Sequence, residues 1–146
     1  MPVRVEESVE IERPPEEVWE FIADPANDPR WCRKVQSVEP AGPRRWTVLH
    51  KPVPMRPAAE LSLEQLVLDP PSRLTMRQED DASVFNVEYR LEPTSAGTHF
   101  TQVSEFEWKK LPRLLHKTFQ RGVRRDVRGQ LRELRKALEA GVRSAG

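Results

Sequence analysis

The chain has 146 residues, which is enough for one domain with a substantial buried core. Hydrophobic residues make up 37% of it and charged residues 32%, as in a soluble globular protein. No apolar run reaches the roughly 18 residues that a membrane span requires. The N-terminus has no basic segment followed by an apolar stretch, so no secretory signal is expected. We therefore expect a single domain, residues 1–146, located in the cytoplasm.

The net charge of +1 conceals an uneven distribution of charged residues. Residues 1–30 carry nine acidic and three basic side chains, whereas residues 109–146 carry twelve basic and three acidic ones. Such an asymmetry indicates either a patch for nucleic acid or a membrane surface, or two chain ends that lie side by side and neutralise each other.

The first segment alternates like a half-buried strand, with Val3, Val5, Val9 and Ile11 on one face. Glu7 falls on that same apolar face. This predicts either a bulge near Glu7 or a glutamate that points inward.

Two short helices are expected after this strand. Pro15 and the two glutamates that follow it suit a first helical turn, because proline fits there and the helix dipole favours acids. Val18, Phe21 and Ile22 form the apolar face of the first helix, and Asp24-Pro25 ends it.

Six further segments alternate apolar and polar residues and are separated by turn signals, including a proline-rich loop at 51–57. They lie at residues 35–39, 46–50, 59–67, 74–78, 85–91 and 100–108. Together with the first segment they predict an antiparallel sheet of seven strands.

The last segment has the period of a long amphipathic helix. Its apolar residues recur every three or four positions, at Leu111, Leu115, Phe119, Val123, Val127, Leu131, Leu134 and Leu138. Gly141 is expected to end a helix that is roughly 45 Å long. Six arginines fall opposite the apolar stripe and predict a solvated face: Arg121, Arg124, Arg125, Arg128, Arg132 and Arg135.

One helix, about 10 Å across, is too narrow to cover seven strands, so the sheet must curl around it and leave a cavity. An apolar wall that carries a few polar groups is typical of small-molecule pockets. The residues expected to bind a ligand there are Trp46, Val48, His50, Leu61, Leu63, Gln65, Leu74, Met76, Gln78, Phe85, Val87, Tyr89, Gln102, Ser104, Phe106, Leu115, Phe119, Val123 and Asp126.

Asp126 is placed by its helical angle near Phe119 and Val123, on the stripe that faces the sheet. A buried carboxylate requires a partner or becomes protonated. Asp126 is therefore expected either to pair with a strand arginine or to act as a polar anchor at one end of the cavity.

Several motifs resemble those of the helix-grip (SRPBCC) superfamily, which includes START lipid-transfer domains, birch-pollen-allergen-like proteins and bacterial polyketide cyclase/dehydrase proteins. They are SVEIERPPEEVWEFIADP at 8–25, Arg30-Trp31, LDPPSRL at 68–74, YRLEP at 89–93 and Gly97-Thr98. The resemblance covers nearly the whole chain. It implies an α+β fold in which a curved seven-stranded antiparallel sheet surrounds a long C-terminal helix.

The resemblance also implies a function, namely binding or transport of a hydrophobic or aromatic small molecule, with residues 51–57 and 80–83 at the cavity entrance. The alternative is a polyketide cyclase, aromatase or dehydratase. Such members place an arginine inside the cavity, whereas the comparable inward positions here read Leu61, Leu63, Gln65 and Val67.

The residues themselves do not decide between a carrier and an enzyme. Arg77 has the parity of a solvent-facing side chain. Tyr89, Ser104 and His50 are available as proton donors or acceptors, but nothing in the sequence shows that they converge. No catalytic residue is assigned.

Other binding classes receive less support from the sequence. No Cys/His cluster resembles a metal site, no cofactor is expected, and the single cysteine, Cys32, is expected to be an inert, partly buried thiol. The second alternative is an anionic surface or nucleic acid bound by the arginine face, although no aromatic stacking residues lie among those arginines. Nucleic acid binding is therefore not expected. The sequence leaves a monomer and a homodimer open.

Overall fold

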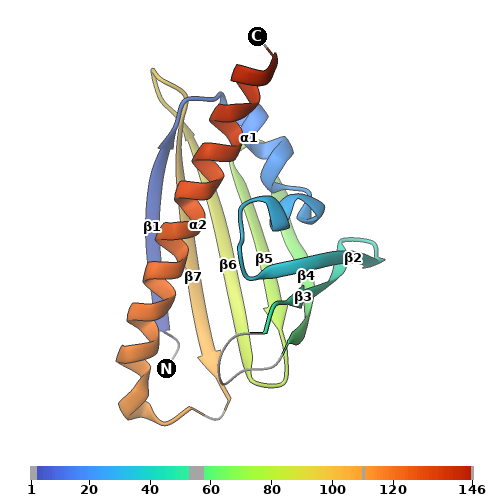
Figure 1. The fold of residues 1–146 in the computed structure, drawn as a ribbon, viewed down its shortest axis with the longest axis vertical. Helices are drawn as coiled ribbons and strands as arrows, with labels where there is room; N and C mark the ends of the chain where they lie inside the picture. Colours follow the sequence, from blue (N-terminus) through green and yellow to red (C-terminus); the bar gives the residue numbers. More distant parts are fainter. Residues whose placement is uncertain (1–2, 53–57, 110, 146) are drawn as a thin grey trace.

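The structure is a computed structural model that describes residues 3–52, 58–109 and 111–145, with the backbone alone for 141–145. Its seven strands are β1 (Val3–Ile11), β2 (Val35–Gly42), β3 (Arg45–His50), β4 (Ala59–Asp69), β5 (Arg73–Glu79), β6 (Ser83–Pro93) and β7 (Thr98–Trp108). They form one antiparallel sheet in the order β1-β7-β6-β5-β4-β3-β2. The predicted helix-grip fold is confirmed, and Figure 1 shows the curved sheet with the long helix along it.

The helices lie at the two ends of the chain. After β1 come α1 (Pro15–Ile22) and the short 3-10 helix η1 (Pro25–Arg30), and after β7 come a second 3-10 turn, η2 (Arg113–Leu115), and the long α2 (His116–Ala145). Helix α1 begins with proline and two glutamates as expected, and it buries Val18 and Ile22.

Both ends of α2 differ from the expectation. Leu111 and Leu115 have the helical period but precede α2, because Pro112 sits in extended backbone and only the single turn η2 follows it. At the other end the helix continues through Gly141 to Ala145, so the predicted stop is wrong. Within a helix glycine costs only about 1 kcal/mol relative to alanine, which the surrounding turns can offset.

Strand β1 settles the position of Glu7. Its pairing with β7 runs without a shift from Val3 opposite Phe106 to Ile11 opposite Thr98. There is no bulge, so Glu7 is the glutamate that points inward. Its side chain is only 17% exposed, and it lies under α2.

The two chain ends neutralise each other at this contact. Helix α2 packs along β1, and the guanidinium groups of Arg124 and Arg128 lie 3.4 and 3.1 Å from the carboxylate of Glu7. Further along, Arg13 donates through Nε to the carbonyl oxygen of Leu138 at 3.0 Å. Part of the predicted arginine face is therefore turned toward the acidic first strand rather than toward solvent alone.

Strand β4 departs from strict alternation near its end. Its register against β5 shifts between Gln65 and Val67, which marks a bulge. Val67 is consequently exposed and Leu68 packs against the core, so the expectation that Val67 faces inward is wrong.

Gly97 occupies the turn before β7. This turn lies against the residues that join β1 to α1. A Cβ at Gly97 would lie 2.2 Å from the Ile11 carbonyl oxygen and 2.6 Å from the Arg13 nitrogen, and its φ is +156°. The adjacent Thr98 hydroxyl donates to the Arg13 carbonyl oxygen at 2.7 Å, so the two segments cannot separate freely.

We predict that Gly97→Ala lowers the free energy of unfolding by at least about 2 kcal/mol more than Gly42→Ala, because positive φ strains both variants but only Gly97 also meets backbone atoms. Gly42 is a matched control, since its φ is +144° and nothing lies within 4 Å of its Cβ position. Urea unfolding of both variants measures the difference. Equal losses would show that the contact at Gly97 does not constrain the fold.

Candidate ligand-binding site

The inner face of the sheet carries most of the residues expected to bind a ligand. Eleven of them are buried there: Val48, Leu61, Leu63, Gln65, Leu74, Met76, Val87, Tyr89, Gln102, Ser104 and Phe106. Five are half-buried, namely Trp46, His50, Gln78, Phe85 and Val123. The remaining three, Leu115, Phe119 and Asp126, are exposed.

One end of this inner face is closed by the helices that follow β1. Trp31, just after η1, is 1% exposed, and its ring lies 5.9 Å from that of Tyr89. Tyr89 in turn lies 5.3 Å from the ring of Phe100. The Gln65 side chain donates to the Ala23 carbonyl oxygen at 2.8 Å, which ties the end of α1 to β4.

The other end carries a row of contacting aromatic rings, and the last of them is largely exposed. Phe85 meets Phe106 edge to face at 4.9 Å between centroids, and Phe106 stacks on Trp108 at 6.0 Å. Trp108 lies 5.8 Å from Phe119 and 5.3 Å from His116, both on α2. Although these side chains touch, Phe119 is still 47% exposed.

The exposure of these side chains follows from where α2 contacts the sheet. The helix buries Val127, Leu131 and Leu134 in its middle turns, whereas Phe119 in its first turn is 47% exposed. The first turns of α2 are therefore not pressed into the core. The 80–83 turn lies beside this end, because Ser83 pairs with Trp108. Most of the 51–57 loop lies outside the described residues.

Polar atoms interrupt the apolar wall on neighbouring strands. Glu7, Gln102 and Tyr89 lie opposite one another on β1, β7 and β6. Gln102 donates through Nε2 to the Ser104 hydroxyl at 3.2 Å, and its buried Oε1 has no hydrogen-bond partner among the described residues. A buried acceptor without a partner is costly, and it can accept a hydrogen bond from a bound molecule.

Asp28 is a buried acid in the segment that follows α1, which the sequence predicts only as a helix break. It lies on η1 and is 8% exposed. Burial and the neighbouring Asp24 raise the pKa of its carboxyl from 3.8 to about 8, although the nearby Trp31 indole opposes the rise. The indole Nε1 nevertheless makes no hydrogen bond of normal geometry within the described chain. An aspartate before a proline is a common turn signal, and nothing in that pattern indicates burial.

Two other titratable groups share this buried region. Burial, with the nearby Asp28, raises the pKa of both the Cys32 thiol and the Tyr89 hydroxyl. Cys32 is therefore a protonated thiol, and it is more deeply buried than expected. Tyr89 keeps its proton and can serve as a hydrogen-bond donor.

Asp126 does not lie on the buried stripe of α2. Its side chain is 46% exposed and pairs with Lys34 at 2.7 Å, so the expected ion pair forms, but with a lysine rather than a strand arginine. The predicted burial is wrong because Val127, one position later, faces the core. Asp126 cannot anchor a ligand in the cavity from this place.

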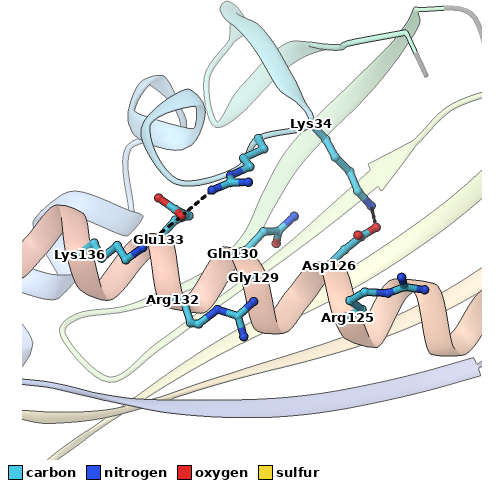
Figure 2. Close-up of a pocket in the computed structure, with 9 residues that line it drawn as sticks. Lys34, Arg125, Asp126, Gly129, Gln130, Arg132, Glu133 and Lys136 are labelled. Carbon is cyan, nitrogen blue, oxygen red and sulfur yellow. Dashed lines mark hydrogen bonds and ion pairs between the residues drawn. The ribbon is translucent and has the colours of Figure 1, made fainter. Parts of the chain in front are cut away.

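Figure 2 shows the hollow beside Asp126, between α2 and the residues that precede β2. Its volume is about 280 Å³, and its lining is charged. Arg33 pairs with Glu133 at 2.9 Å, and the Lys34–Asp126 pair lies on the other side of Gln130. This hollow is distinct from the aromatic end of the sheet and has the wrong chemistry for an apolar ligand.

Three further features of the described residues concern arginine, metal ligands and membrane-spanning helices. None of the buried residues in the described chain is an arginine, and Arg77 is exposed and pairs with Glu79. No cluster of metal-ligating side chains occurs within residues 3–52, 58–109 and 111–145. In the part of the chain that the structure describes, no helix is long and apolar enough to span a membrane.

Comparisons with known proteins agree with this architecture. The sequence model of a family described as polyketide cyclase / dehydrase and lipid transport matches residues 2–139. Comparison with curated protein sequences finds no match.

Solved structures of similar fold include two aromatase/cyclases. The Zhui aromatase/cyclase from Streptomyces sp. R1128 is 18% identical with a TM-score of 0.79, and the match covers 100% of this chain and 99% of that one. The di-domain StfQ of the steffimycin pathway is 15% identical with a TM-score of 0.76, covering 97% of this chain and 52% of that one. Protein SA2116 of Staphylococcus aureus, of unknown function, is 13% identical with a TM-score of 0.74, covering 98% and 97%. At these identities the likeness concerns the fold alone.

We predict that Asp28→Asn changes the pH dependence of stability. Because the pKa of Asp28 is raised from 3.8 to about 8, the folded chain retains a proton that the unfolded chain releases. This contribution is fully present below about pH 4 and is lost as the pH rises toward 8. Asparagine does not titrate, so it removes this loss of stability. Across that pH range the free energy of unfolding of the variant should rise relative to that of the wild type, by about 1.4 kcal/mol for each unit of pKa shift.

Urea midpoints measured across this pH range test the prediction. Asp81→Asn, at an exposed acid on the β5–β6 turn, is the control and should run parallel to the wild type. A constant offset between Asp28→Asn and the wild type at every pH would show that folding does not raise the pKa of Asp28.

Proposed function

The chain belongs to the polyketide cyclase / dehydrase and lipid transport family, and from that premise we propose that it binds a hydrophobic or aromatic small molecule between the sheet and α2. The observation that carries the proposal is the aromatic end of the inner face. Phe85 contacts Phe106, Phe106 stacks on Trp108, and Trp108 contacts Phe119, which is nevertheless 47% exposed. Apolar surface left open on the concave side of a sheet is suited to an apolar ligand.

The closed end suggests what else the ligand carries. The unpartnered Oε1 of Gln102 accepts hydrogen bonds, and the protonated Tyr89 hydroxyl on the neighbouring strand donates them. A ligand with an apolar body and a hydroxyl or carbonyl group at one end would satisfy both ends of the wall. A plain hydrocarbon would leave Gln102 without a partner.

A second candidate function, cyclisation of a bound polyketide, is favoured by this same polar row. Tyr89, Gln102 and Ser104 are buried together on β6 and β7, where proton donors and acceptors would contact a substrate carbonyl. None of the buried residues that the structure describes is an arginine that could polarise that carbonyl, which favours binding over catalysis. Chromatography with mass spectrometry separates the two functions. Cyclisation with dehydration removes one water, cyclisation alone changes the retention time at constant mass, and binding changes neither.

We predict that Phe119→Ser weakens binding of the apolar fluorophore Nile red by about tenfold, as expected for losing the contact of one large apolar side chain. Leu66→Ser is a matched control, because Leu66 is also 47% exposed but lies at the β4 bulge. It should bind the probe like the wild type. Fluorescence titration of the three proteins measures the affinities.

Two results of these binding measurements would contradict the proposal. If the wild type does not bind Nile red and native mass spectrometry finds no retained small molecule, the cavity is collapsed and the proposed function is rejected. If both serine variants lose binding equally, the probe reports general surface adsorption rather than the aromatic end.

A further inference from the structure

The connection between β7 and α2 exposes an unusual amount of apolar surface. Five large apolar side chains are exposed in the described chain, and three of them, Leu114, Leu115 and Phe119, lie within this one connection and the first helical turn. Leu114 is 94% exposed. The other two, Leu66 and Val67, are accounted for by the β4 bulge.

The same segment is strongly basic. Residues 109–125 contain seven lysines and arginines and no acidic residue. Among the residues that the structure describes, no carboxylate pairs with Arg113, Lys117 or Arg121. The ion pairs described for α2 lie further along the helix, where its bases meet Glu7 of β1 or its own glutamates, and where its acids Asp126 and Glu133 pair with Lys34 and Arg33. These three positive charges are therefore free to act on a partner.

Acids do approach the edge of this surface. Glu79 ends β5 and Asp80 begins the turn to β6. Lys109 forms an ion pair of 3.3 Å with Glu79 and donates a hydrogen bond of 3.0 Å to the Asp80 carbonyl oxygen. Asp81 is exposed on the same turn. The charge of the connection thus remains positive beyond Lys109, from Arg113 onward.

We infer that the segment 111–121 docks on an anionic lipid bilayer, with Leu114 entering the interface and Arg113, Lys117 and Arg121 lying against lipid phosphates. Exposed leucine and phenylalanine among unpaired basic residues have the composition of an interfacial membrane-binding helix. Each basic side chain near an anionic leaflet adds attraction. A protein-binding surface differs, because charged residues are depleted from its centre.

The docking surface adjoins the open end of the inner face. Phe119 belongs to α2 and contacts Trp108, the last residue of β7 and part of the aromatic lining. A bilayer held against Leu114 would therefore face the entrance to the cavity. Passage of an apolar ligand between the bilayer and the cavity depends on the proposed function. The docking itself does not depend on it.

Vesicle flotation of the full chain tests the docking. We expect the protein to float with vesicles made of equal parts phosphatidylcholine and phosphatidylserine, and to remain behind with phosphatidylcholine alone. Leu114→Ser should weaken binding to the anionic vesicles by about tenfold, because one exposed leucine no longer enters the interface. The double variant Arg113→Glu/Lys117→Glu should abolish flotation.

Two variants of matched chemistry serve as controls. Leu66→Ser removes an exposed leucine elsewhere, and Lys136→Glu reverses a 74% exposed charge on the same helix, in a weak 3.8 Å pair with Glu133. Both should float like the wild type. No flotation of the wild type, or equal losses in Lys136→Glu and the double variant, would overturn the inference.

Nile red binding measured on the same proteins keeps this test separate from the proposed function. Leu114→Ser should retain the probe affinity, so loss of flotation with intact probe binding supports docking. Retention of the wild type on duplex DNA without any flotation would identify the segment as a nucleic-acid surface and reject the membrane. Wild type that floats but binds no probe would reject the proposed cavity function and leave docking intact.

Discussion

The geometry of the inner face depends on one constraint, that a single helix about 10 Å wide must cover seven strands spaced about 4.8 Å apart. The chain meets it asymmetrically. Helix α2 is fastened along β1, where Arg124 and Arg128 reach the inward Glu7 and where Leu131 and Leu134 are buried. The strands farther from β1 are closed by α1 and η1 at one end only. At the other end no helix covers the aromatic side chains completely, and Phe119 remains exposed.

Strand parity was enough to predict the seven strands and the inner face, because the period of two is strong in β4 to β7 and only one bulge interrupts it. The same parity left Glu7 ambiguous. A bulge and an inward glutamate produce the same pattern in sequence. The two are distinguished by the arginines of α2, which lie over Glu7 and pair with it. Such a pair joins residues more than a hundred positions apart, which a local pattern does not encode.

Side-chain environments were harder to predict than elements. Asp126 and Val127 are neighbours on α2, and an error of one position in the helix rotation placed the acid inside and left its true partner, Lys34, unnoticed. Asp28 was missed for a different reason. Its burial depends on how η1 folds back over Tyr89, and a short aspartate-proline segment has no periodicity from which that packing follows.

The pairing of β1 with β7 also carries an entropic cost that the other strand pairs avoid. Val3 lies opposite Phe106, so the first and last strands form one ladder across about a hundred intervening residues. Closing a loop of that length costs on the order of 4 kcal/mol of chain entropy. The hairpins β2 to β7 involve only sequence neighbours and carry no such cost. The meander can therefore form first, with β1 and α2 added afterwards as a joint closing step that completes the sheet.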